Sequence, residues 1–363
     1  MTRFLTASSS KAVQQATRTL HEWQPARQGL GVALVYGPVS LEDRLYHSKC
    51  PVEQRSVTAL SGALKEIGVR WKVLDPCEPS FIPELAGYDA VLSNLHGPFG
   101  EDGRLQGLLD YIRMPYCGSG VAASAVAADK VLCKRVMESL GVPTPGWWVW
   151  SGGPVDWAGT AVMVKPPFGG SSVGMSLVRD RAALPLALAD AARDEGDPVL
   201  VEDYVPGVPL TVGLLELPSG EVLVFPPLAT EVTEADFYDA DTKLDADSKG
   251  AVTVRAAELK PALLAETTGY ATTLWDGMDL RGSARVDFVL TQAGQVYALE
   301  VNTTPGMSRD SNFAVGGAMV GLTHTDIVLA MLHEALARPP YDVPLPTPAF
   351  SSSTPTREAA VSP

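Results

Sequence analysis

The stretch from residue 285 to residue 306 constrains the fold of this chain more than any other part of its sequence. Two β-rich runs, 285–290 and 295–302, flank a short Gly-containing turn at 291–294. Two such runs around so short a turn predict a β-hairpin. We therefore expect an antiparallel pair of strands here, and we interpret the remaining segments around it.

The polar side chains of this hairpin predict a metal site. Side chains alternate along a strand, so Arg285 and Asp287 share one face, and Glu300 and Asn302 share one face. Closing the hairpin brings Asp287 to within about one residue of facing Glu300. Two carboxylates and an amide oxygen suit Mg²⁺, which prefers one or two carboxylates plus the phosphates of a nucleotide. The same pattern also fits an antiparallel pair with one solvated polar face.

Composition limits the class of protein. The 363 residues suit two or three linked α/β subdomains, and 46% hydrophobic with 19% charged residues is ordinary for a globular protein. The net charge of −14 argues against nucleic-acid binding, but an anionic substrate needs only local positive charge. The four cysteines form no C-x-x-C pair and no zinc spacing, which favours a reduced, cytoplasmic setting. No apolar run approaches the roughly 18 residues of a membrane span, so we expect no membrane partner.

The first part of the chain alternates between strand and helix patterns. A buried strand, a helix and two more short strands are predicted in the segments 31–36, 52–67, 69–74 and 90–95. This order is typical of an open doubly wound parallel sheet, whose ligands bind at the carboxyl ends of its strands. That rule indicates Glu42 and His96 as candidate ligand-binding residues. Before this sheet, the first 28 residues predict a loosely held extra helix at about 12–23.

A loop rich in glycine and serine lies in the middle of the chain. Strands predicted at 161–165 and 175–178 enclose it at 166–174. The backbone N–H groups of such a loop can cover a triphosphate. Its spacing is not that of a P-loop, and an ordinary flexible hairpin is the alternative interpretation.

The later segments add weaker signals. A strand at 199–205 carries Glu202 and Val205, and adenine is often bound by apolar segments of this kind that also hold a carboxylate. Residues 229–250 are polar and irregular, and so long a loop inside a compact domain is more often functional than idle. Helices are predicted at about 256–278 and at 324–337, and the tail from residue 339 has the Pro-, Ser- and Thr-rich composition of a disordered segment.

Several ordered blocks of the chain occur together at family-like distances. They are Leu95-His96-Gly97, Gly100-Glu101-Asp102-Gly103-Arg104-Leu105-Gln106-Gly107, Pro115-Tyr116 with Gly118-Ser119-Gly120, Asp129-Lys130, Gly169-Gly170-Ser171-Ser172-Val173-Gly174-Met175 and Glu300-Val301-Asn302-Thr303-Thr304-Pro305-Gly306-Met307. With these blocks the chain resembles the D-alanine–D-alanine ligase family of the ATP-grasp superfamily. The resemblance covers nearly everything except the two ends of the chain.

The resemblance implies an α/β ATP-grasp fold with ATP held between two β-sheets. It divides the chain into an N-terminal extension, an open doubly wound parallel-sheet domain for substrate, a central ATP-grasp subdomain, a C-terminal ATP-grasp subdomain with the metal site, and a flexible tail. The corresponding ranges are 1–28, 29–120, 121–202, 203–338 and 339–363.

The same resemblance implies that ATP drives peptide-bond formation between two amino acids through an acyl phosphate, with release of ADP. Lys130, Lys165 and Lys243 would neutralise the phosphates. The metal ligands would hold two magnesium ions. The expected metal ligands are Asp287, Glu300 and Asn302, and the other expected ATP contacts are Gly170, Ser172, Glu202 and Val205.

The resemblance also assigns residues to the two amino acids. Arg285 and the backbone N–H of Gly306 would stabilise the oxyanion of the tetrahedral intermediate. Glu42 would grip the ammonium of the first substrate, in a triad with Ser171 and a residue of the long loop, and His96 would lie beside its carboxylate. Ser311 would bind the carboxylate of the second substrate. The implied partners are small-molecule amino acids and, since the family commonly pairs, a second copy of the chain.

The chain departs from the family pattern at several positions. Leu244 stands where dipeptide-making members usually have a tyrosine, so the hydrogen-bonded triad cannot be complete. Asn312 stands where a leucine usually lines the second substrate pocket, and Gly169 and Pro209 replace two expected glutamates. Our first hypothesis is a ligase of the D-alanine–D-alanine type. The alternatives are a specialised amino-acid or peptide ligase of secondary metabolism with another acceptor, and an ATP-binding module that no longer catalyses.

Overall fold

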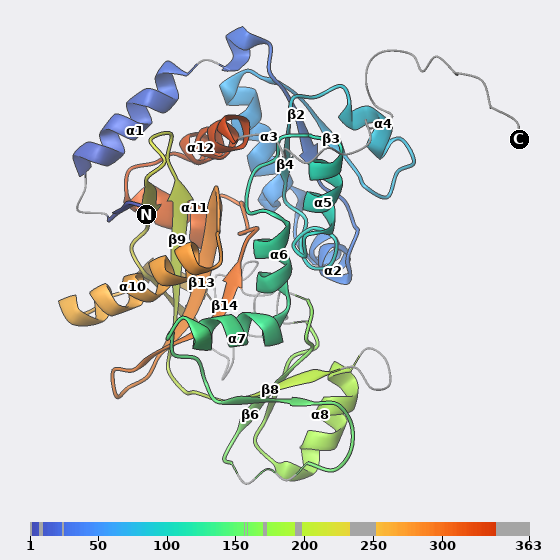
Figure 1. Ribbon diagram of the computed structural model, residues 1–363, viewed down its shortest axis with the longest axis vertical. Helices are drawn as coiled ribbons and strands as arrows, with labels where there is room; N and C mark the ends of the chain where they lie inside the picture. Colours follow the sequence, from blue (N-terminus) through green and yellow to red (C-terminus); the bar gives the residue numbers. More distant parts are fainter. Residues whose placement is uncertain are drawn as a thin grey trace, which may run out of the picture.

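The computed structural model describes residues 2–6, 10–23, 25–155, 157, 159–169, 173–192, 198–232 and 252–338. The strands of these residues form three sheets (Figure 1): a three-stranded parallel sheet, a four-stranded sheet and a seven-stranded sheet. The two larger sheets lie on either side of helix α7 (Lys130–Ser139), which Figure 1 shows between them.

The parallel sheet confirms the prediction of a doubly wound domain. Strand β2 (Gly31–Val35) lies between β3 (Arg70–Leu74) and β4 (Ala90–Ser93), and both pairings are parallel. Every residue of β2 is buried because apolar clusters cover both of its faces. The helices around this sheet are α2 (Leu41–Lys49), α3 (Ser56–Ile67), α4 (Phe81–Leu85) and α5 (Arg104–Tyr111), with the short 3-10 helix η2 (Val52–Gln54) before α3.

The four-stranded sheet is antiparallel and has two different faces. Its strands are, in spatial order, β5 (Trp147–Trp150), β8 (Val199–Asp203), β6 (Val162–Lys165) and β7 (Ser176–Val178). The valines of β6 and β8 pack on α8 (Leu184–Ala191), which follows the 3-10 helix η3 (Arg181–Ala183). Because side chains alternate along a strand, Lys165 and Glu202 lie on the opposite face.

The seven-stranded sheet is organised around β9 (Val208–Glu216). One edge of β9 pairs with β13 (Ser283–Leu290), and the other edge pairs with β10 (Val222–Val224) and β11 (Leu228–Val232). The outer strands of this sheet are β14 (Val296–Asn302) beside β13, β12 (Val252–Ala256) beside β11, and β1 (Phe4–Leu5) beside β10. The helices that pack on it include α10 (Pro261–Gly277), α11 (Asn312–Met319) and α12 (His324–Ala337).

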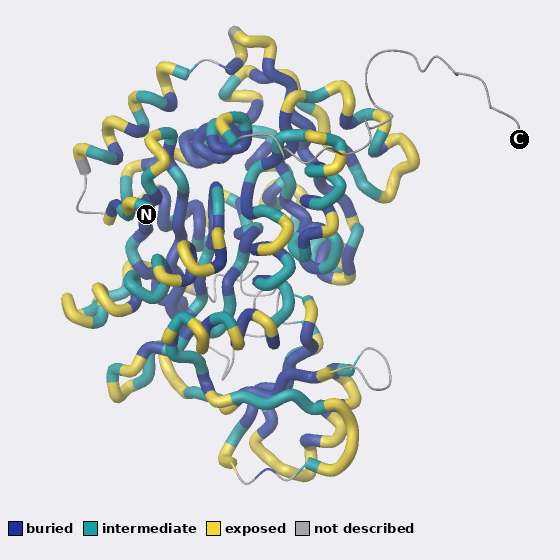
Figure 2. The backbone as a smooth tube through the Cα atoms, in the orientation of Figure 1, coloured by how far each residue is buried: buried dark blue, intermediate teal, exposed yellow. Residues whose placement is uncertain are grey.

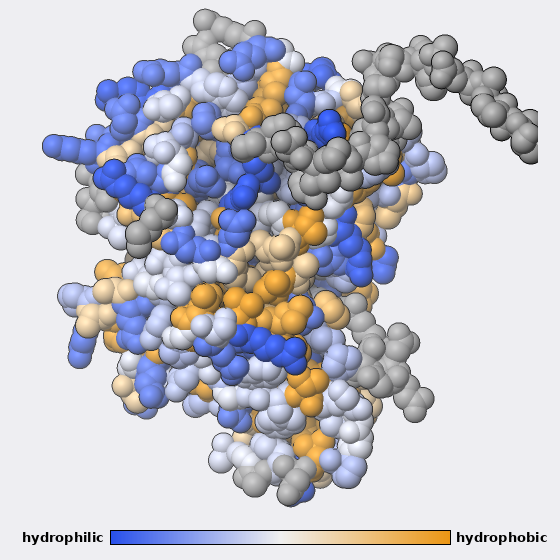
Figure 3. All heavy atoms as spheres, viewed as in Figure 1, coloured by the Kyte–Doolittle hydropathy of each residue, from blue (hydrophilic) through white to orange (hydrophobic). Residues whose placement is uncertain are grey.

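Helices α6 (Val121–Ala128) and α7 share their core with this seven-stranded sheet. The sequence-based boundary groups residues 121–202 together, but the small apolar side chains of α6 and α7 join one cluster with β13 and β14. The core of the four-stranded sheet is a separate cluster that begins at Trp157. On the face seen in Figure 3, apolar side chains gather over α6 and α7, where Val121 and Leu132 are exposed.

Two sequence-based expectations about helices were wrong. The helix predicted from about residue 256 begins at Pro261, because residues 252–256 instead form β12 and pair with β11. The N-terminal helix α1 (Ser10–Glu22) is not loosely held, since Val13, Ala16 and Leu20 are buried in the same core as α12. Figure 2 shows this inner side of α1 as buried and its outer side as exposed. The predicted last helix, 324–337, is confirmed.

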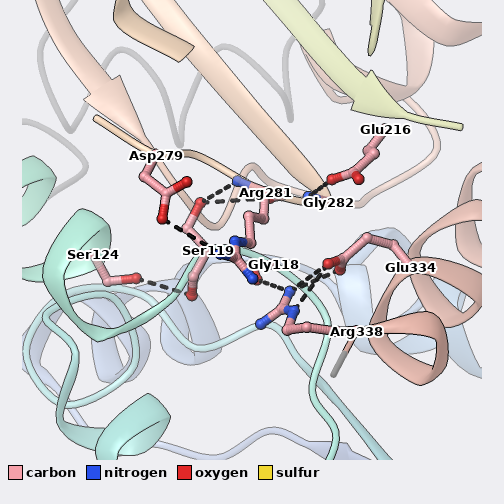
Figure 4. A network of polar contacts seen from close by, with 9 residues as sticks. All are labelled: Gly118, Ser119, Ser124, Glu216, Asp279, Arg281, Gly282, Glu334 and Arg338. Atoms are coloured by element: carbon pink, nitrogen blue, oxygen red, sulfur yellow. Dashed lines mark hydrogen bonds and ion pairs between the residues drawn. The ribbon is translucent and has the colours of Figure 1, made fainter. Parts of the chain in front are cut away.

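A polar network joins the parallel-sheet domain to the seven-stranded sheet and α12 (Figure 4). The hydroxyl of Ser119 accepts a hydrogen bond from the backbone N–H of Arg281 at 3.1 Å and donates to its carbonyl at 3.4 Å. Arg338 pairs with both carboxylate oxygens of Glu334, at 2.7 and 2.8 Å, and donates to the carbonyl of Gly118 at 2.6 Å. Burial of the Glu334 carboxyl, partly opposed by Arg338, raises its pKa to about 7.

The described residues contain no single helix that is long and apolar enough to cross a membrane. Helices α11 and α12 reach that length and composition only as a pair, and the chain bends by 100° between them. None of the four cysteines, all of which lie among the described residues, forms a disulfide bond.

Candidate active site

The hairpin of β13 and β14 has the predicted register. Asp287 lies directly opposite Glu300, and Arg285 lies directly opposite Asn302. Directly opposed residues of an antiparallel pair point to the same side of the sheet, so the four polar side chains share one face. The register shifts just after Asp287, where Leu299 is an extra residue on β14. The turn after β13 closes through a hydrogen bond from the N–H of Thr291 to the carbonyl of Gln295 at 2.9 Å.

Arg285 and Asp287 form a two-pronged ion pair on this face. Nε of Arg285 donates to Oδ1 of Asp287 at 2.9 Å, and Nη2 donates to Oδ2 at 2.8 Å. The guanidinium also lies 3.9 Å from the carboxylate of Glu300. On β9, the hydroxyl of Thr211 donates to Oδ1 of Asp287 at 2.6 Å. Burial lowers the pKa of Arg285, but the Asp287 carboxylate outweighs burial and holds that pKa above its usual range.

The oxygen atoms of this face fit a magnesium ion that also takes phosphate ligands. Asp287 and Glu300 offer opposed carboxylates, and the Glu300 side chain is 40% exposed and so can be reached from outside. Oδ1 of Asn302 already accepts a hydrogen bond from the N–H of Thr304 at 2.9 Å, which leaves one lone pair. No group of three or more His, Cys, Asp or Glu side chains suited to a metal occurs in the described part of the chain. Mg²⁺ bound through nucleotide phosphates needs fewer protein ligands than that.

A second charged cluster lies on the four-stranded sheet. Nζ of Lys165, at the end of β6, lies 2.6 Å from Oε1 of Glu202 on β8. The other oxygen of Glu202 pairs with Lys134, from helix α7. Lys134 also donates to the hydroxyl of Thr144. Both lysines and Glu202 are buried. The structure thus brings Lys165 and Glu202 together and adds Lys134, which the sequence analysis missed.

The position of Lys134 in the sequence holds a signal that could have identified it. Lys134 follows Lys130 by four residues, and residues i and i+4 of a helix lie on the same face. Asp129 caps this helix by accepting from the N–H groups of Val131 and Leu132, at 2.9 and 3.0 Å. The cap sets the start of the helix, and the i, i+4 spacing then directs both lysines toward the four-stranded sheet.

Lys130 lies between the two charged clusters. Its ammonium donates to the carbonyl of Gly169, at the start of the Gly- and Ser-rich loop. Burial lowers the pKa of Lys130, and among the charged groups that act on it are Glu300 of the hairpin, Lys165 and Glu42. The predicted phosphate-binding lysine is therefore within electrostatic reach of both sheets. Five predicted site residues lie outside the described residues, namely Gly170, Ser171, Ser172, Lys243 and Leu244.

Glu42 and His96 meet at the carboxyl ends of the parallel strands, as the sequence predicts. Glu42 is buried, and its carboxylate lies so close to Gly97 that a Cβ there would come within 2.6 Å of Oε2. Asp43 holds His96 by accepting from its backbone N–H at 2.9 Å, with Nδ1 of the ring 3.4 Å away. Burial lowers the pKa of His96, but hydrogen bonding to Asp43 and the charge of Glu101 raise it more.

Asp43 and Glu101 are site residues that the sequence analysis did not assign. Asp43 also completes a capping box with Ser40 at the start of α2, which places Glu42 in the first turn of that helix. Glu101 accepts from the N–H of Gly97 at 2.6 Å, and burial raises its pKa to about 7. Glu101 belongs to one of the blocks that carry the family resemblance, so its sequence context was a usable signal.

The segment after β14 carries the remaining predicted residues. The hydroxyl of Ser311 accepts from the N–H of Ala314 at 3.3 Å and caps α11, which still leaves its O–H able to donate to a ligand. Asn312 is the first residue of that helix. Gly306 lies in a loop that is tied to the parallel-sheet domain, since Asn94 donates to the carbonyl of Pro305 at 3.3 Å. Val205 follows the end of β8, close in sequence to Glu202.

Comparisons with known proteins agree with this architecture. The family model described as D-ala D-ala ligase C-terminus matches residues 153–333, and that described as D-ala D-ala ligase N-terminus matches residues 53–119. The D-alanine--D-alanine ligase of Synechococcus sp. (strain JA-2-3B'a(2-13)) is 36% identical over 301 residues, which are 78% of this chain and 90% of that protein. The D-alanine--D-alanine ligase of Ectopseudomonas mendocina (strain ymp) is 37% identical over 313 residues, 84% of this chain and 94% of that protein.

Solved structures share the fold at lower sequence identity. D-alanyl-alanine synthetase A from Vibrio cholerae has a TM-score of 0.72 and 23% identity, covering 85% of this chain and 99% of its own. D-alanine--D-alanine ligase from Bacillus anthracis, complexed with ATP, has a TM-score of 0.69 and 21% identity, covering 85% of this chain and 97% of its own. The chain therefore belongs to the D-alanine–D-alanine ligase family of ATP-dependent ligases and has the ATP-grasp fold.

Proposed function

We propose that the protein uses ATP and Mg²⁺ to join the carboxylate of one amino acid to the amine of another, with D-alanine as the first candidate for both. The family membership supports the reaction class. The observation that carries the proposal is the shared face of Arg285, Asp287, Glu300 and Asn302, with Lys130 within electrostatic reach of Glu300. This arrangement offers cation ligands, an oxyanion donor and phosphate-neutralising charge in one place.

In the first step, a carboxylate oxygen of the acyl donor attacks the γ-phosphate of ATP. The bond to the β-phosphate oxygen breaks, giving an acyl phosphate and ADP. Negative charge spreads over the transferred phosphoryl group, so Lys130, Lys165 and Lys243 would neutralise it. Asp287, Glu300 and Asn302 would hold magnesium, which supplies further positive charge at the phosphate oxygens.

In the second step, the amine of the acceptor attacks the acyl carbon, and inorganic phosphate leaves. The carbonyl oxygen carries negative charge in the tetrahedral intermediate, and Arg285 with the N–H of Gly306 would donate to it. Glu42 and His96 lie together at the parallel sheet and would orient the acyl donor. The O–H of Ser311 would donate to the carboxylate of the acceptor.

A ligase with a different acceptor is the second candidate. Two departures in the sequence favour it: Leu244 can neither donate nor accept a hydrogen bond, and Asn312 adds a polar group at the position expected to line the acceptor pocket. A nucleotide-binding module without catalysis is less well supported, because loss of function would be expected to remove metal ligands such as Asp287 and Glu300 first.

One assay separates the three candidates. The protein is incubated with ATP, Mg²⁺ and a panel of D- and L-amino acids, and phosphate release and product mass are followed. D-Alanine dipeptide supports the first candidate, another amide supports the second, and no phosphate release from any pair supports the third. Analytical ultracentrifugation in the same buffer tests whether the protein is a homodimer, an expectation that comes from the family resemblance.

The substitution Leu244→Tyr tests the missing triad member. A tyrosine would restore a hydroxyl at position 244, and we expect the rate of D-alanine dipeptide formation to rise relative to other products. An unchanged product ratio would remove Leu244 as a determinant of specificity.

A further inference from the structure

The buried cluster on the four-stranded sheet contains more positive than negative charge. Two ammonium groups, those of Lys134 and Lys165, share the single carboxylate of Glu202. The exposed fractions are 1% for Lys134, 7% for Lys165 and 2% for Glu202. Burial raises the pKa of Glu202, but the two lysines lower it more, so the carboxyl stays ionised. Burial lowers the pKa of Lys134, and the charge of Glu202 opposes that shift. With both lysines protonated, the cluster carries one more positive than negative charge in a place that water hardly reaches.

An excess buried charge is costly unless an anion lies beside it. Methionine would fill the space of Lys134 without that cost, so packing alone does not account for a lysine here. Lys130, one helical turn before Lys134, adds a further amine nearby: burial lowers its pKa most, and charge repulsion by Lys165 lowers it further. A phosphate group is the anion that the proposed function brings to these lysines.

Lys134 and Lys165 reach Glu202 from different elements, helix α7 and strand β6. Lys134 projects from α7, which packs against β14 of the seven-stranded sheet. Its ammonium donates to Thr144, whose hydroxyl in turn donates to the carbonyl of Ala298 on β14 at 2.8 Å. The N–H of Ala298 donates to the carbonyl of Pro143, also at 2.8 Å. Lys134 thus holds one oxygen of Glu202 from helix α7, which packs on the seven-stranded sheet, while Lys165 holds the other from within the four-stranded sheet.

We infer that Lys134 is a positioning residue for the phosphates of ATP: it holds one oxygen of Glu202 and thereby leaves the ammonium of Lys165 partly uncompensated. A carboxylate shared between two ammonium groups neutralises each of them less than it would neutralise one. Without Lys134, both oxygens of Glu202 turn to Lys165, and less of its charge and fewer of its three N–H donors are available to a phosphate. The inference rests on the proposed function, because it takes the anion to be ATP.

The test measures ATP binding by titration calorimetry and steady-state kinetics for Lys134→Met, Glu202→Gln and the double variant. We expect Lys134→Met to raise the Kd for ATP about tenfold or more, with KM for the amino acids within about twofold. In the Glu202→Gln background, we expect Lys134→Met to change the Kd by less than about twofold, because Lys134 acts through Glu202. The control is Lys72→Met, which removes an exposed lysine paired with Glu84.

Several results would overturn the inference. One is an unchanged Kd for ATP in Lys134→Met. Another is that Lys134→Met weakens ATP binding equally in the wild-type and Glu202→Gln backgrounds. The third is equal changes in KM for ATP and for the amino acids, as a general loss of structure would cause. If Lys134→Met does not fold, Lys134→Arg takes its place, since it keeps the charge but changes the geometry at Glu202. A change in Kd that vanishes in the Glu202→Gln background supports the inference, and a change that persists, or no change in either background, overturns it. A wild-type protein that neither binds ATP nor releases phosphate would instead contradict the proposed function.

Discussion

The two charged clusters of the site differ in how they are built. The cluster on the seven-stranded sheet comes mainly from one hairpin, and its side chains are only partly buried, with Arg285 18% and Glu300 40% exposed. The cluster on the four-stranded sheet comes from a helix and two strands far apart in the sequence, and its three charged side chains are almost fully buried. The first has access to solvent and to a cation, while the second holds two ammonium groups and one carboxylate in a region of low dielectric.

This difference shows which kind of site can be changed without loss of the fold. Partly exposed charges interact through water and contribute little to stability, so the hairpin can be arranged for chemistry. Buried charges depend on each other, and removal of one partner leaves another uncompensated. Substitutions at the hairpin should therefore change activity with little change in stability, whereas substitutions at the buried cluster should change both.

The largest expected effect is at the hairpin and concerns catalysis. Arg285→Ala removes the proposed oxyanion donor, and loss of one such donor typically lowers kcat by about 10²- to 10³-fold. We expect the Kd for ATP to change much less, because the guanidinium acts on the reacting carbonyl. Stopped-flow phosphate release gives kcat, and Arg285→Lys is the matched control that keeps the charge. Full activity in Arg285→Ala would show that the oxyanion assignment is wrong.

The same substitution in both clusters tests the contrast in stability. Glu202→Gln leaves two buried ammonium groups without a carboxylate and should lower the free energy of unfolding by about 3 kcal/mol. Glu300→Gln changes a side chain that is 40% exposed and should cost less than about 1 kcal/mol. Urea unfolding of the two variants measures both values. Equal losses would contradict the distinction between the clusters.

A smaller effect is expected from the threonine that supports Asp287. Thr211→Val removes the 2.6 Å hydrogen bond to the carboxylate without changing the shape of the side chain. Loss of such a supporting bond to a metal ligand typically weakens metal binding by about tenfold or more. The Mg²⁺ concentration for half-maximal activity should rise accordingly. Thr267→Val, on α10 and bonded only to the backbone of its own helix, is the control and should leave the Mg²⁺ dependence unchanged.

The smallest expected effect lies outside both clusters, in the network around Glu334 (Figure 4). Burial raises the pKa of this carboxyl from 4.5 to about 7. Between these values the folded state binds more protons than the unfolded state, so the contribution of Glu334 to stability falls as pH rises. Glu334→Gln removes that dependence, and its Tm relative to wild type should rise by about 2–4 °C from about pH 5 to about pH 8. A relative Tm that falls over this range would mean that the ion pair with Arg338 outweighs burial.

Local patterns predicted the hairpin and the parallel sheet well, for a physical reason. The face shared by Arg285 and Asp287 follows from the period of a strand, and the meeting with Glu300 follows from a short turn. The buried strand 31–35 follows from its continuous apolar pattern, and the placing of Glu42 and His96 close together follows from the rule for the carboxyl ends of parallel strands.

Contacts between distant segments could not be predicted in the same way. Strands β9 and β12 are defined by their pairing with β13 and β11, and no local pattern separated β12 from the helix that follows it. Lys134 lies in a helix whose partner Glu202 is 68 residues away in the sequence, 202 − 134, so only the fold brings them together. The burial of α1 against α12 joins segments even further apart.

A crystal structure with ADP and Mg²⁺ tests the central claim most directly, because the claim places the nucleotide phosphates between the two clusters. The account predicts Mg²⁺ bound by oxygens of Asp287, Glu300 and Asn302, with the terminal phosphate within hydrogen-bond distance of Lys165. A structure in which the nucleotide is bound but those oxygens point away from its terminal phosphate would contradict the account.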